Sequence, residues 1–124
     1  MNNLTVIVPM LPPSVNHCYR NNGRGGRILT DEAKTFRELV YYEARSTAQL
    51  TGWELPAGAL AFTLVLVFGD DRRCDIDNRI KSAIDAVALA LGFDDARVRR
   101  IVIEHAGVER CRPLCEMILE AHDG

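Results

Sequence analysis

The sequence predicts an α/β (α+β) fold: a single two-layer sandwich in which a mixed β-sheet of about four strands carries two main helices. Predicted elements occur in the order strand, helix, strand, helix, strand, strand, which is typical of this class. The 124 residues match one domain in length, and 48% hydrophobic with 26% charged residues indicates a globular chain. No repeat, linker or low-complexity segment interrupts it, so we expect residues 1–124 to form one domain.

The N-terminal part combines a strand with a long basic loop. Leu4–Val8 alternates and is β-branched, which predicts a strand. A loop follows to about Arg27, and its Gly and Asn residues favour turns. Residues 16–27 contain three Arg and no acidic residue. A loop of this length is often functional or mobile, so this basic segment is a candidate binding element.

The first helix is predicted from its capping residue onward. Thr30 has the character of an N-cap, and two acidic residues follow it at the positive end of the helix dipole. The helix is expected to reach about Leu50 and to stop at Thr51-Gly52. Its apolar face follows helical spacing through Ala33, Phe36, Val40, Ala44 and Thr47.

The next strand and helix surround a short polar turn. Leu60–Phe68 is nearly all apolar, which predicts a strand covered on both faces. After a turn at residues 69–73, a second helix is expected from about Asp77 to Leu91, and it ends at Gly92. The predicted apolar face of this helix consists of Ile80, Ile84, Val87 and Leu91.

Two more strands are expected at the C-terminal end. A short loop, residues 93–96, leads into Val98–Ala106, and Leu114–Ala121 follows. Residues 107–113 are expected to join these two strands as a hairpin.

The charge balance of the chain has two components. The net charge of −2 argues against non-specific binding to nucleic acid. However, 13 of the 15 basic residues are Arg, which binds phosphate groups through two parallel N–H donors. A GC-rich genome offers an alternative explanation of the Arg bias. The near-zero total therefore combines a basic loop with an acidic cluster elsewhere.

Targeting signals and cysteine spacing favour a cytoplasmic protein. No apolar run approaches the ~20 residues of a membrane span, and the first residues lack the Lys or Arg of a signal peptide. We therefore expect a soluble cytoplasmic domain. None of the four cysteines has C-x-x-C spacing, which favours reduced thiols. A zinc site using Cys111, Cys115 and His105 is the weaker alternative.

The clearest chemical signal is Asp75-Ile76-Asp77-Asn78. Two carboxylates at a strand-to-helix junction can converge on one hard cation. Lys81 lies one turn beyond Asp77 and projects on nearly the same helical face. Asp94 and Asp95 follow the other end of the helix, which at 15 residues is roughly 22 Å long. The carboxylates before and after the helix meet at one metal only if the chain after Gly92 folds back, or if the next strand runs beside Leu60–Phe68 and returns them to the junction. The sequence leaves this open.

The same acidic and basic residues also have a structural interpretation, which is the stronger one on spacing alone. Asp75 or Asp77 would cap the helix. Lys81 would pair with Asp77 or Asp85, and Asp94-Asp95 would form a solvated turn.

Several motifs occur along the chain in a characteristic order. A Pro-Pro-Ser-x-Asn opening with an aromatic residue and Arg lies within Leu11–Arg20, and a Gly/Arg loop and Phe36-Arg37 follow. The most specific motifs surround the acidic segment: Arg72–Asn78, then Lys81, Asp85 and Gly92, and then Asp94–Val98. In their order and in chain length these motifs resemble the RusA family of Holliday-junction resolvases, small prophage-type endonucleases.

The resemblance implies a catalytic site. It carries over Asp75, Asp77 and Asp95 as magnesium ligands and Lys81 as a further residue needed for cleavage. Asp95 is preferred to Asp94 because it stands directly before Ala96-Arg97-Val98. Independently of the family, phosphodiester hydrolysis needs an activated water and stabilisation of phosphate charge, and Mg²⁺ held by carboxylates supplies both.

The resemblance also implies a DNA substrate. We expect DNA contacts from Arg20, Arg24, Arg27, Arg72, Arg73, Asn16 and Tyr19. Arg72 and Arg73 have an equal alternative as a solvated turn. Tyr19 and His17 are expected either to contact unpaired bases or phosphates or, for Tyr19, to pack at the root of the loop.

The implied activity is that of a Mg²⁺-dependent structure-selective endodeoxyribonuclease. It resolves four-way junctions and related branched DNA by paired symmetric nicks, in DNA recombination and repair. Two such nicks predict a symmetric homodimer. The candidate interface residues, which have core packing as their alternative, are Tyr41, Tyr42, Trp53 and Phe93. The competing functions are a non-catalytic nucleic-acid-binding phage accessory protein and a small zinc or redox protein.

Overall fold

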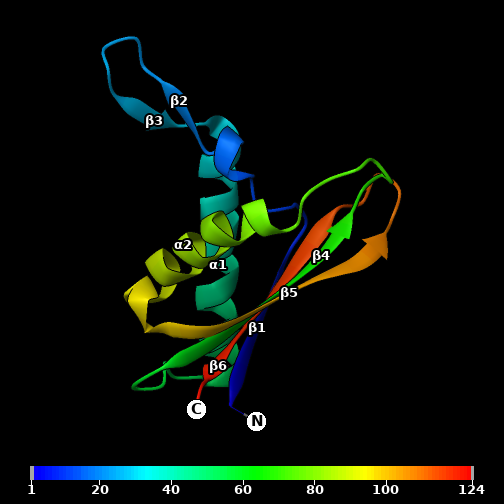
Figure 1. Ribbon diagram of the computed structural model, residues 1–124. Coiled ribbons are helices and arrows are strands. Elements are labelled where there is room, and N and C mark those ends of the chain that lie inside the picture. The colour runs from blue at the N-terminus through cyan, green and yellow to red at the C-terminus, as the bar shows by residue number, and fades with distance from the viewer. Residues whose placement is uncertain (1, 124) are drawn as a thin grey trace.

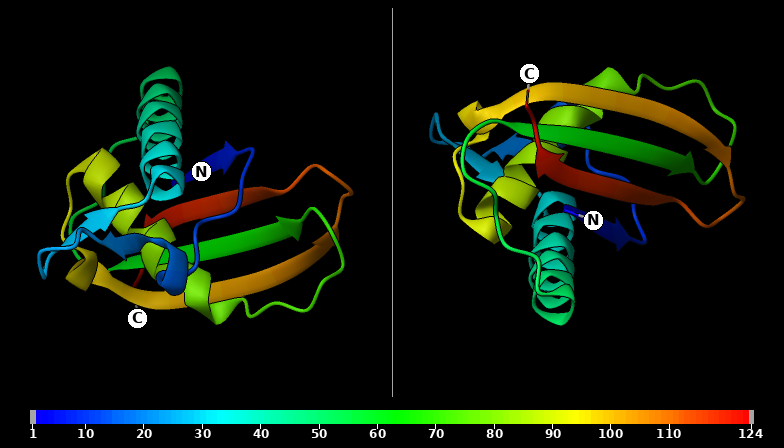
Figure 2. Two further views of the ribbon diagram at one scale, coloured as in Figure 1. Left: turned by 90° about the horizontal axis from the view of Figure 1, so that it is seen from above. Right: turned by 90° about the horizontal axis from the view of Figure 1, so that it is seen from below.

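Both helices lie on one face of a four-stranded sheet in the computed structural model, which describes residues 2–123 (Figures 1 and 2). Helix α1 (Asp31–Thr51) packs against α2 (Ile80–Leu91) and against the first strand. This arrangement confirms the predicted two-layer α+β class with a mixed sheet. Within residues 2–123, no helix combines the length and apolar character needed to cross a membrane.

The sheet contains the strands β1 (Asn3–Val8), β6 (Leu114–Ala121), β4 (Leu60–Phe68) and β5 (Val98–Val108), in this spatial order. β4 pairs with β5 in parallel, whereas the β1–β6 and β6–β4 pairs are antiparallel. Because parallel neighbours need a crossover connection, α2 runs from the end of β4 back to the start of β5.

The expected hairpin between the last two strands is wrong. β5 and β6 are consecutive in sequence, but β4 lies between them and pairs with both. β4 is the most apolar strand of the chain, so the central position of the sheet buries it best.

The expectation that Leu60–Phe68 is covered on both faces is also wrong. Its burial alternates: Phe62, Leu64 and Leu66 are buried, whereas Thr63, Val65 and Val67 are only half-buried. The cause is that α1 and α2 cover the same face of the sheet, so the opposite face has no helical layer (Figure 2).

The long basic loop is more ordered than the sequence suggests. A 3₁₀ turn (Val15–His17) leads into a small antiparallel hairpin of β2 (Tyr19–Asn21) and β3 (Arg27–Leu29), which projects beyond the helical layer (Figure 1). The strands are only three residues long, and their pattern is too short to be recognised from alternation alone.

Helix α1 begins and ends as predicted. The Oγ1 of Thr30 accepts a hydrogen bond from the N–H of Ala33 at 3.2 Å. The same hydroxyl donates to the carbonyl of His17 at 2.7 Å, which ties the preceding turn to the helix. At the other end, Gly52 adopts φ 72°, and its N–H donates to the carbonyl of Ala48, a cap that favours glycine.

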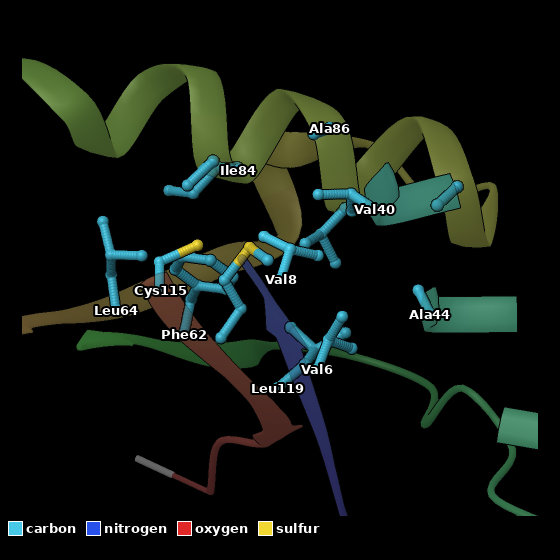
Figure 3. Packing of buried hydrophobic residues seen from close by; sticks show 14 of the residues in the cluster. Val6, Val8, Val40, Ala44, Phe62, Leu64, Ile84, Ala86, Cys115 and Leu119 are labelled. Atoms are coloured by element: carbon cyan, nitrogen blue, oxygen red, sulfur yellow. The ribbon is translucent and has the colours of Figure 1, made fainter. Parts of the chain in front are cut away.

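The core lies between the helical layer and the sheet (Figure 3). The strands β1, β4 and β6 contribute alternate residues, such as Val6, Phe62 and Leu119, and the helices contribute residues such as Val40 and Ile84. Each fully buried side chain of this size stabilises the fold by about 1.5–3 kcal/mol relative to an exposed one. The two layers therefore hold each other in one fixed arrangement.

Two of the four candidate interface aromatics belong to the monomer's own core. Trp53 and Phe93 pack against the core cluster as half-buried residues. Tyr41 and Tyr42 are 48% and 68% exposed on α1. Trp53 and Phe93 differ from the two tyrosines in their place in the chain. Each follows the C-terminal end of a helix and packs against the core, whereas Tyr41 and Tyr42 lie in the middle of α1.

The cysteines are free thiols. Cys115 points into the core from β6, and burial raises its pKa to about 12. Cys111 is exposed beyond the end of β5, and the ring of His105 stacks on Phe68 at 4.7 Å. Within residues 2–123, no three His, Cys, Asp or Glu side chains form a group that could hold a metal ion, so the zinc alternative gains no support.

We predict that Thr30→Ala lowers the free energy of unfolding by about 1 kcal/mol, because the N-cap acceptor of α1 and the link to His17 are both lost. Denaturant unfolding followed by circular dichroism measures this change. Thr51→Ala is the matched control: its hydroxyl donates to the carbonyl of Thr47 on the exposed surface, and we expect a change below about 0.5 kcal/mol. Equal effects of the two variants would contradict the capping role of Thr30.

Candidate functional site

The loop between β4 and α2 carries the two carboxylates that the sequence singles out. Asp75 and Asp77 are both exposed, and within residues 2–123 neither forms a hydrogen bond or an ion pair. Asp77 begins a 3₁₀ turn (Asp77–Arg79), and no side chain caps this turn or α2. The capping role that the structural interpretation assigned to these carboxylates is therefore wrong. They remain available to a cation or another ligand.

The start of α2 is fixed to the segment before the basic hairpin. The Nη1 of Arg79 donates to the carbonyl of Pro12 at 2.7 Å, and the Oγ of Ser82 donates to the carbonyl of Pro13 at 2.6 Å. The guanidinium of Arg79 also lies 5.7 Å from the ring centroid of Phe68 at the end of β4. These contacts hold the two ends of the carboxylate loop, because Phe68 precedes the loop and Arg79 follows it.

Within the described residues, two buried polar atoms next to the carboxylates have no hydrogen-bond partner. The Oδ1 of Asn78 is buried, and within residues 2–123 it accepts no hydrogen bond. The Nε of Arg79 is in the same condition. Buried polar groups are normally hydrogen-bonded, so these two atoms are exceptions within the described residues.

Lys81 projects from the first turn of α2. Its Nζ lies 3.4 Å from each carboxylate oxygen of Asp85, one turn further along the helix. Of the two partners that the spacing allowed, the structure therefore selects Asp85 and not Asp77. The Lys81 side chain is 68% exposed, so this pair leaves it accessible to a substrate.

The distal acidic pair lies at the opposite end of α2. The Oδ1 of Asp94 accepts a hydrogen bond from the N–H of Ala96 at 2.9 Å and caps a 3₁₀ turn (Asp95–Arg97). Asp95 is exposed and, in the described part of the chain, has no side-chain partner. Asp94 thus has a structural role, while Asp95 is free to bind.

The structure does not bring the three predicted ligands together. The 12 residues of α2, about 18 Å of helix, separate Asp77 from Asp95. The loop after α2 leads directly into β5 and does not fold back to the carboxylate loop (Figure 1). A single chain therefore presents Asp75 and Asp77 at one end of α2 and Asp95 at the other.

The two arginines before the carboxylates differ in their surroundings. Arg72 forms an ion pair with Asp70 at 3.0 Å, and its hydrogen bond holds the pKa of that carboxyl below its usual range. Arg72 is therefore engaged in the local turn. Arg73 is exposed, and within residues 2–123 it has no ion-pair partner. Of the two, Arg73 is the more available for a DNA contact.

The basic hairpin presents its arginines to solvent. The Oδ1 of Asn22 accepts from the N–H groups of Arg24 and Gly26 and so shapes the turn. Arg20, Arg24 and Arg27 are exposed, as is Asn16 in the preceding 3₁₀ turn. The guanidinium of Arg27 stacks 4.9 Å from the ring centroid of Tyr19. His17 is held by Ser14, whose Oγ lies 2.8 Å from its Nδ1.

A groove lies between the hairpin, α1 and α2. Its volume is about 300 Å³, and Tyr19, Arg27, Arg37, Lys81 and Asp85 are among its lining residues. Arg37 and Asp85 also line a second hollow, which contains Asp94 and Asp95 at the far end of α2. Sequence reasoning missed this groove because its walls come from three distant elements. Its nearest sequence signals were Phe36-Arg37 and Asp85, which occur among the matching motifs.

Comparison with known proteins finds one family model and several similar proteins that bear the same name. Residues 9–114 match the family model described as endodeoxyribonuclease RusA. The crossover junction endodeoxyribonucleases RusA of Shigella sonnei (strain Ss046) and Escherichia coli (strain K12) are each 34% identical to the chain over 100 residues. The matched region covers 79% of this chain and 78% of each relative.

We predict that Ser82→Ala lowers the free energy of unfolding by about 1–3 kcal/mol, because the carbonyl of Pro13 then keeps only a weak thiol contact from Cys18 at 3.8 Å. Thermal and denaturant unfolding measure the loss. Ser46→Ala, at a half-buried position of α1 without such a bond, is the control, and we expect a change below about 0.5 kcal/mol. If Ser82→Ala is as stable as the control variant, the link does not hold the start of α2.

Proposed function

Because the chain belongs to the RusA family of endodeoxyribonucleases, we propose that it is a Mg²⁺-dependent nuclease that resolves Holliday junctions and related branched DNA. It acts by paired symmetric nicks, in DNA recombination and repair, and residues 1–124 serve as one endonuclease domain. The observation that carries the proposal is the exposed pair Asp75 and Asp77 on a loop whose two ends are fixed.

The two loop carboxylates suit a magnesium ion. They are exposed, they stand two residues apart, and in the described part of the chain no cation neutralises them. Mg²⁺ is commonly bound by one or two carboxylates together with waters and substrate phosphates. Asp75 and Asp77 would hold the ion, which supplies an activated water and neutralises charge on the phosphate.

Lys81 is suited to stabilise charge on the scissile phosphate. Its ammonium group is exposed and lies one helical turn beyond Asp77. Asp85 positions this group without burying it. A positioned cation acts most strongly where negative charge develops in the transition state.

The basic hairpin is suited to hold the DNA backbone. Arg20, Arg24 and Arg27 are exposed on a projecting hairpin, with Asn16 and Tyr19 beside them. Contacts to phosphate oxygens fix the position of a protein on DNA without reading its sequence. The concentration of positive charge in this element allows a chain of net charge −2 to bind DNA locally.

The proposal requires two copies of the chain. One copy separates Asp95 from Asp75 and Asp77 by the length of α2. A two-fold dimer would let Asp95 of the partner subunit complete the metal site, and the same symmetry would supply two sites for two nicks. The separated ligands and the paired reaction thus support the same assembly.

The edge strand β5 offers a surface for this dimer. It has 11 residues, and in the described part of the chain no strand covers its outer edge. Ile101, Val102 and Val108 are 37–48% exposed on it, beside the exposed Arg99, Arg100 and Glu104. An uncovered edge of this length can pair with another strand. If two β5 strands pair antiparallel, the start of β5 in one copy, which follows Asp95, lies beside the end of β5 in the partner. The end of β5 is paired with the end of β4, and β4 leads from there into the loop of Asp75 and Asp77.

We predict that Asp75→Asn and Asp77→Asn each abolish nicking of a labelled four-way junction in Mg²⁺, because each change removes a metal-directed charge at nearly constant shape. Folding should be unaffected, and junction affinity should be equal or higher because negative charge near phosphates is lost. Asp71→Asn, in the exposed turn of the same loop, is the control and should nick normally. Wild-type nicking by either site variant would show the metal assignment to be wrong.

We predict that Lys81→Ala slows nicking about 100-fold, as expected for loss of a charge contact in the transition state. Thermal stability should hardly change, because an exposed pair one helical turn apart contributes only about 0.2–0.5 kcal/mol. Lys34→Ala removes the only other lysine, which is exposed on α1, and should nick normally. Single-turnover rates with saturating enzyme provide the comparison. Equal rates for the two variants would assign Lys81 to its structural pair alone.

We predict that light scattering reports about twice the chain mass at micromolar concentration. Replacing both Ile101 and Val102 by Lys should give a folded monomer, because lysines on an edge strand oppose pairing. Replacing both Thr5 and Ile7 by Lys is the control: it adds the same two charges at exposed positions of the other edge strand and should leave the chain dimeric. A monomeric wild-type chain that also stays monomeric on junction DNA would contradict the dimer.

A further inference from the structure

The groove between the hairpin, α1 and α2 has apolar walls that the fold does not use. Val15 and Tyr19 line it and are 44% and 39% exposed. The half-buried Leu29 extends the same surface, and the buried core residue Phe36 lies beneath it. Its volume of about 300 Å³ lies at the lower end of the range of small-ligand sites. The groove therefore offers an apolar slot for a small flat group.

The rim of the groove is cationic. Arg27, Arg37 and Lys81 line it together with a single carboxylate, Asp85. Within residues 2–123, Arg27 and Arg37 have no carboxylate partner, and both lie instead against Tyr19. The guanidinium of Arg27 lies 4.9 Å from its ring centroid, and the Nη2 of Arg37 donates to its hydroxyl at 3.5 Å. The ring and the hydroxyl of Tyr19 thus hold these two cations and leave their charge available to an anion.

We propose that this groove binds one unpaired nucleotide of branched DNA, with the base against Val15, Tyr19 and Leu29 and its phosphate on the cationic rim. This proposal rests on the proposed function, since it names the part of the substrate that the site recognises. A flat apolar group joined to an anion is the chemistry that apolar walls and a cationic rim fit together. Bases stack on aromatic and guanidinium surfaces whatever their identity, so the groove reads the unpaired state.

This binding mode accounts for selectivity toward branched DNA. A nucleotide inside a duplex must be unstacked and unpaired before it enters such a groove, whereas a nucleotide that is already unpaired incurs least of this cost. A branch point interrupts the regular stacking of a duplex and so lowers the cost for the nucleotides beside it. Lys81 links the groove to catalysis, because the same ammonium group lines the groove and lies one turn beyond Asp77. A nucleotide in the groove would bring its neighbouring phosphate toward the carboxylate loop.

The test compares an intact four-way junction with junctions that carry one abasic nucleotide at each branch-point position in turn. Binding is measured in EDTA, so that no cleavage occurs. For the wild-type chain, we expect affinity to fall about tenfold at one or more positions, as for loss of one base stack. Tyr19→Ala should bind the intact and abasic junctions equally, and Tyr19→Phe should retain the wild-type difference because it keeps the ring.

A pocket-filling variant provides an independent arm. Val15→Trp enlarges an exposed side chain at the groove and should also abolish the difference between the two junctions. Leu50→Trp makes the same kind of change at an 86% exposed position near the end of α1 and should retain the wild-type difference. Thermal melting confirms that each variant folds. Affinity for plain duplex should be the same for Val15→Trp and Leu50→Trp.

The outcomes separate the groove from the proposed activity. Equal wild-type affinity for intact and abasic junctions at every position would overturn the groove proposal, even if the chain nicks junctions in Mg²⁺. Retention of the difference by Val15→Trp would overturn it as well. A wild-type chain that shows the difference and fails to nick would support the groove while contradicting the nuclease assignment.

Discussion

The parallel pairing of β4 with β5 sets the position of every candidate catalytic residue. Parallel neighbours require a crossover, and here the crossover is α2, which spans the helical layer from one strand end to the other. Asp75 and Asp77 precede this helix, and Asp95 follows it. Because an α-helix has a fixed rise per residue, no adjustment of the loops joins its two ends. The separation of the carboxylates is therefore a consequence of the sheet, and it is the basis of our proposal that two copies form the site.

Fixation of the carboxylate loop depends on a segment far away in sequence. Pro12 and Pro13 lack backbone donors, but their carbonyls accept hydrogen bonds from Arg79 and Ser82 on the other side of the loop. The Pro-Pro-Ser opening thus supports the start of α2. The same segment continues into the basic hairpin, so one stretch of chain couples the position of the two loop carboxylates to that of the exposed hairpin arginines.

Local signals in the sequence predicted local structure well. Thr30 and Gly52 delimit α1 because each satisfies backbone groups within one turn of itself. Strand order was not predictable in this way, since the insertion of β4 between β5 and β6 depends on pairing across the whole chain. The site shows the same division: Lys81 was identified with two possible partners, and only the rotamer in the folded chain selects Asp85. The groove, built from three distant elements, left no local pattern to find.

The central claim, that Asp95 of one copy completes the site of the other, is tested by mixing two inactive variants. Asp75→Asn and Asp95→Asn chains are each expected to be inactive alone. After they are mixed and exchange subunits, each mixed dimer should contain one intact site, formed by Asp75 and Asp77 of one chain and Asp95 of its partner. The account predicts that nicking of a four-way junction in Mg²⁺ reappears on mixing, as single unpaired nicks. If the mixture remains as inactive as its components while subunit exchange is demonstrated, the shared site is contradicted.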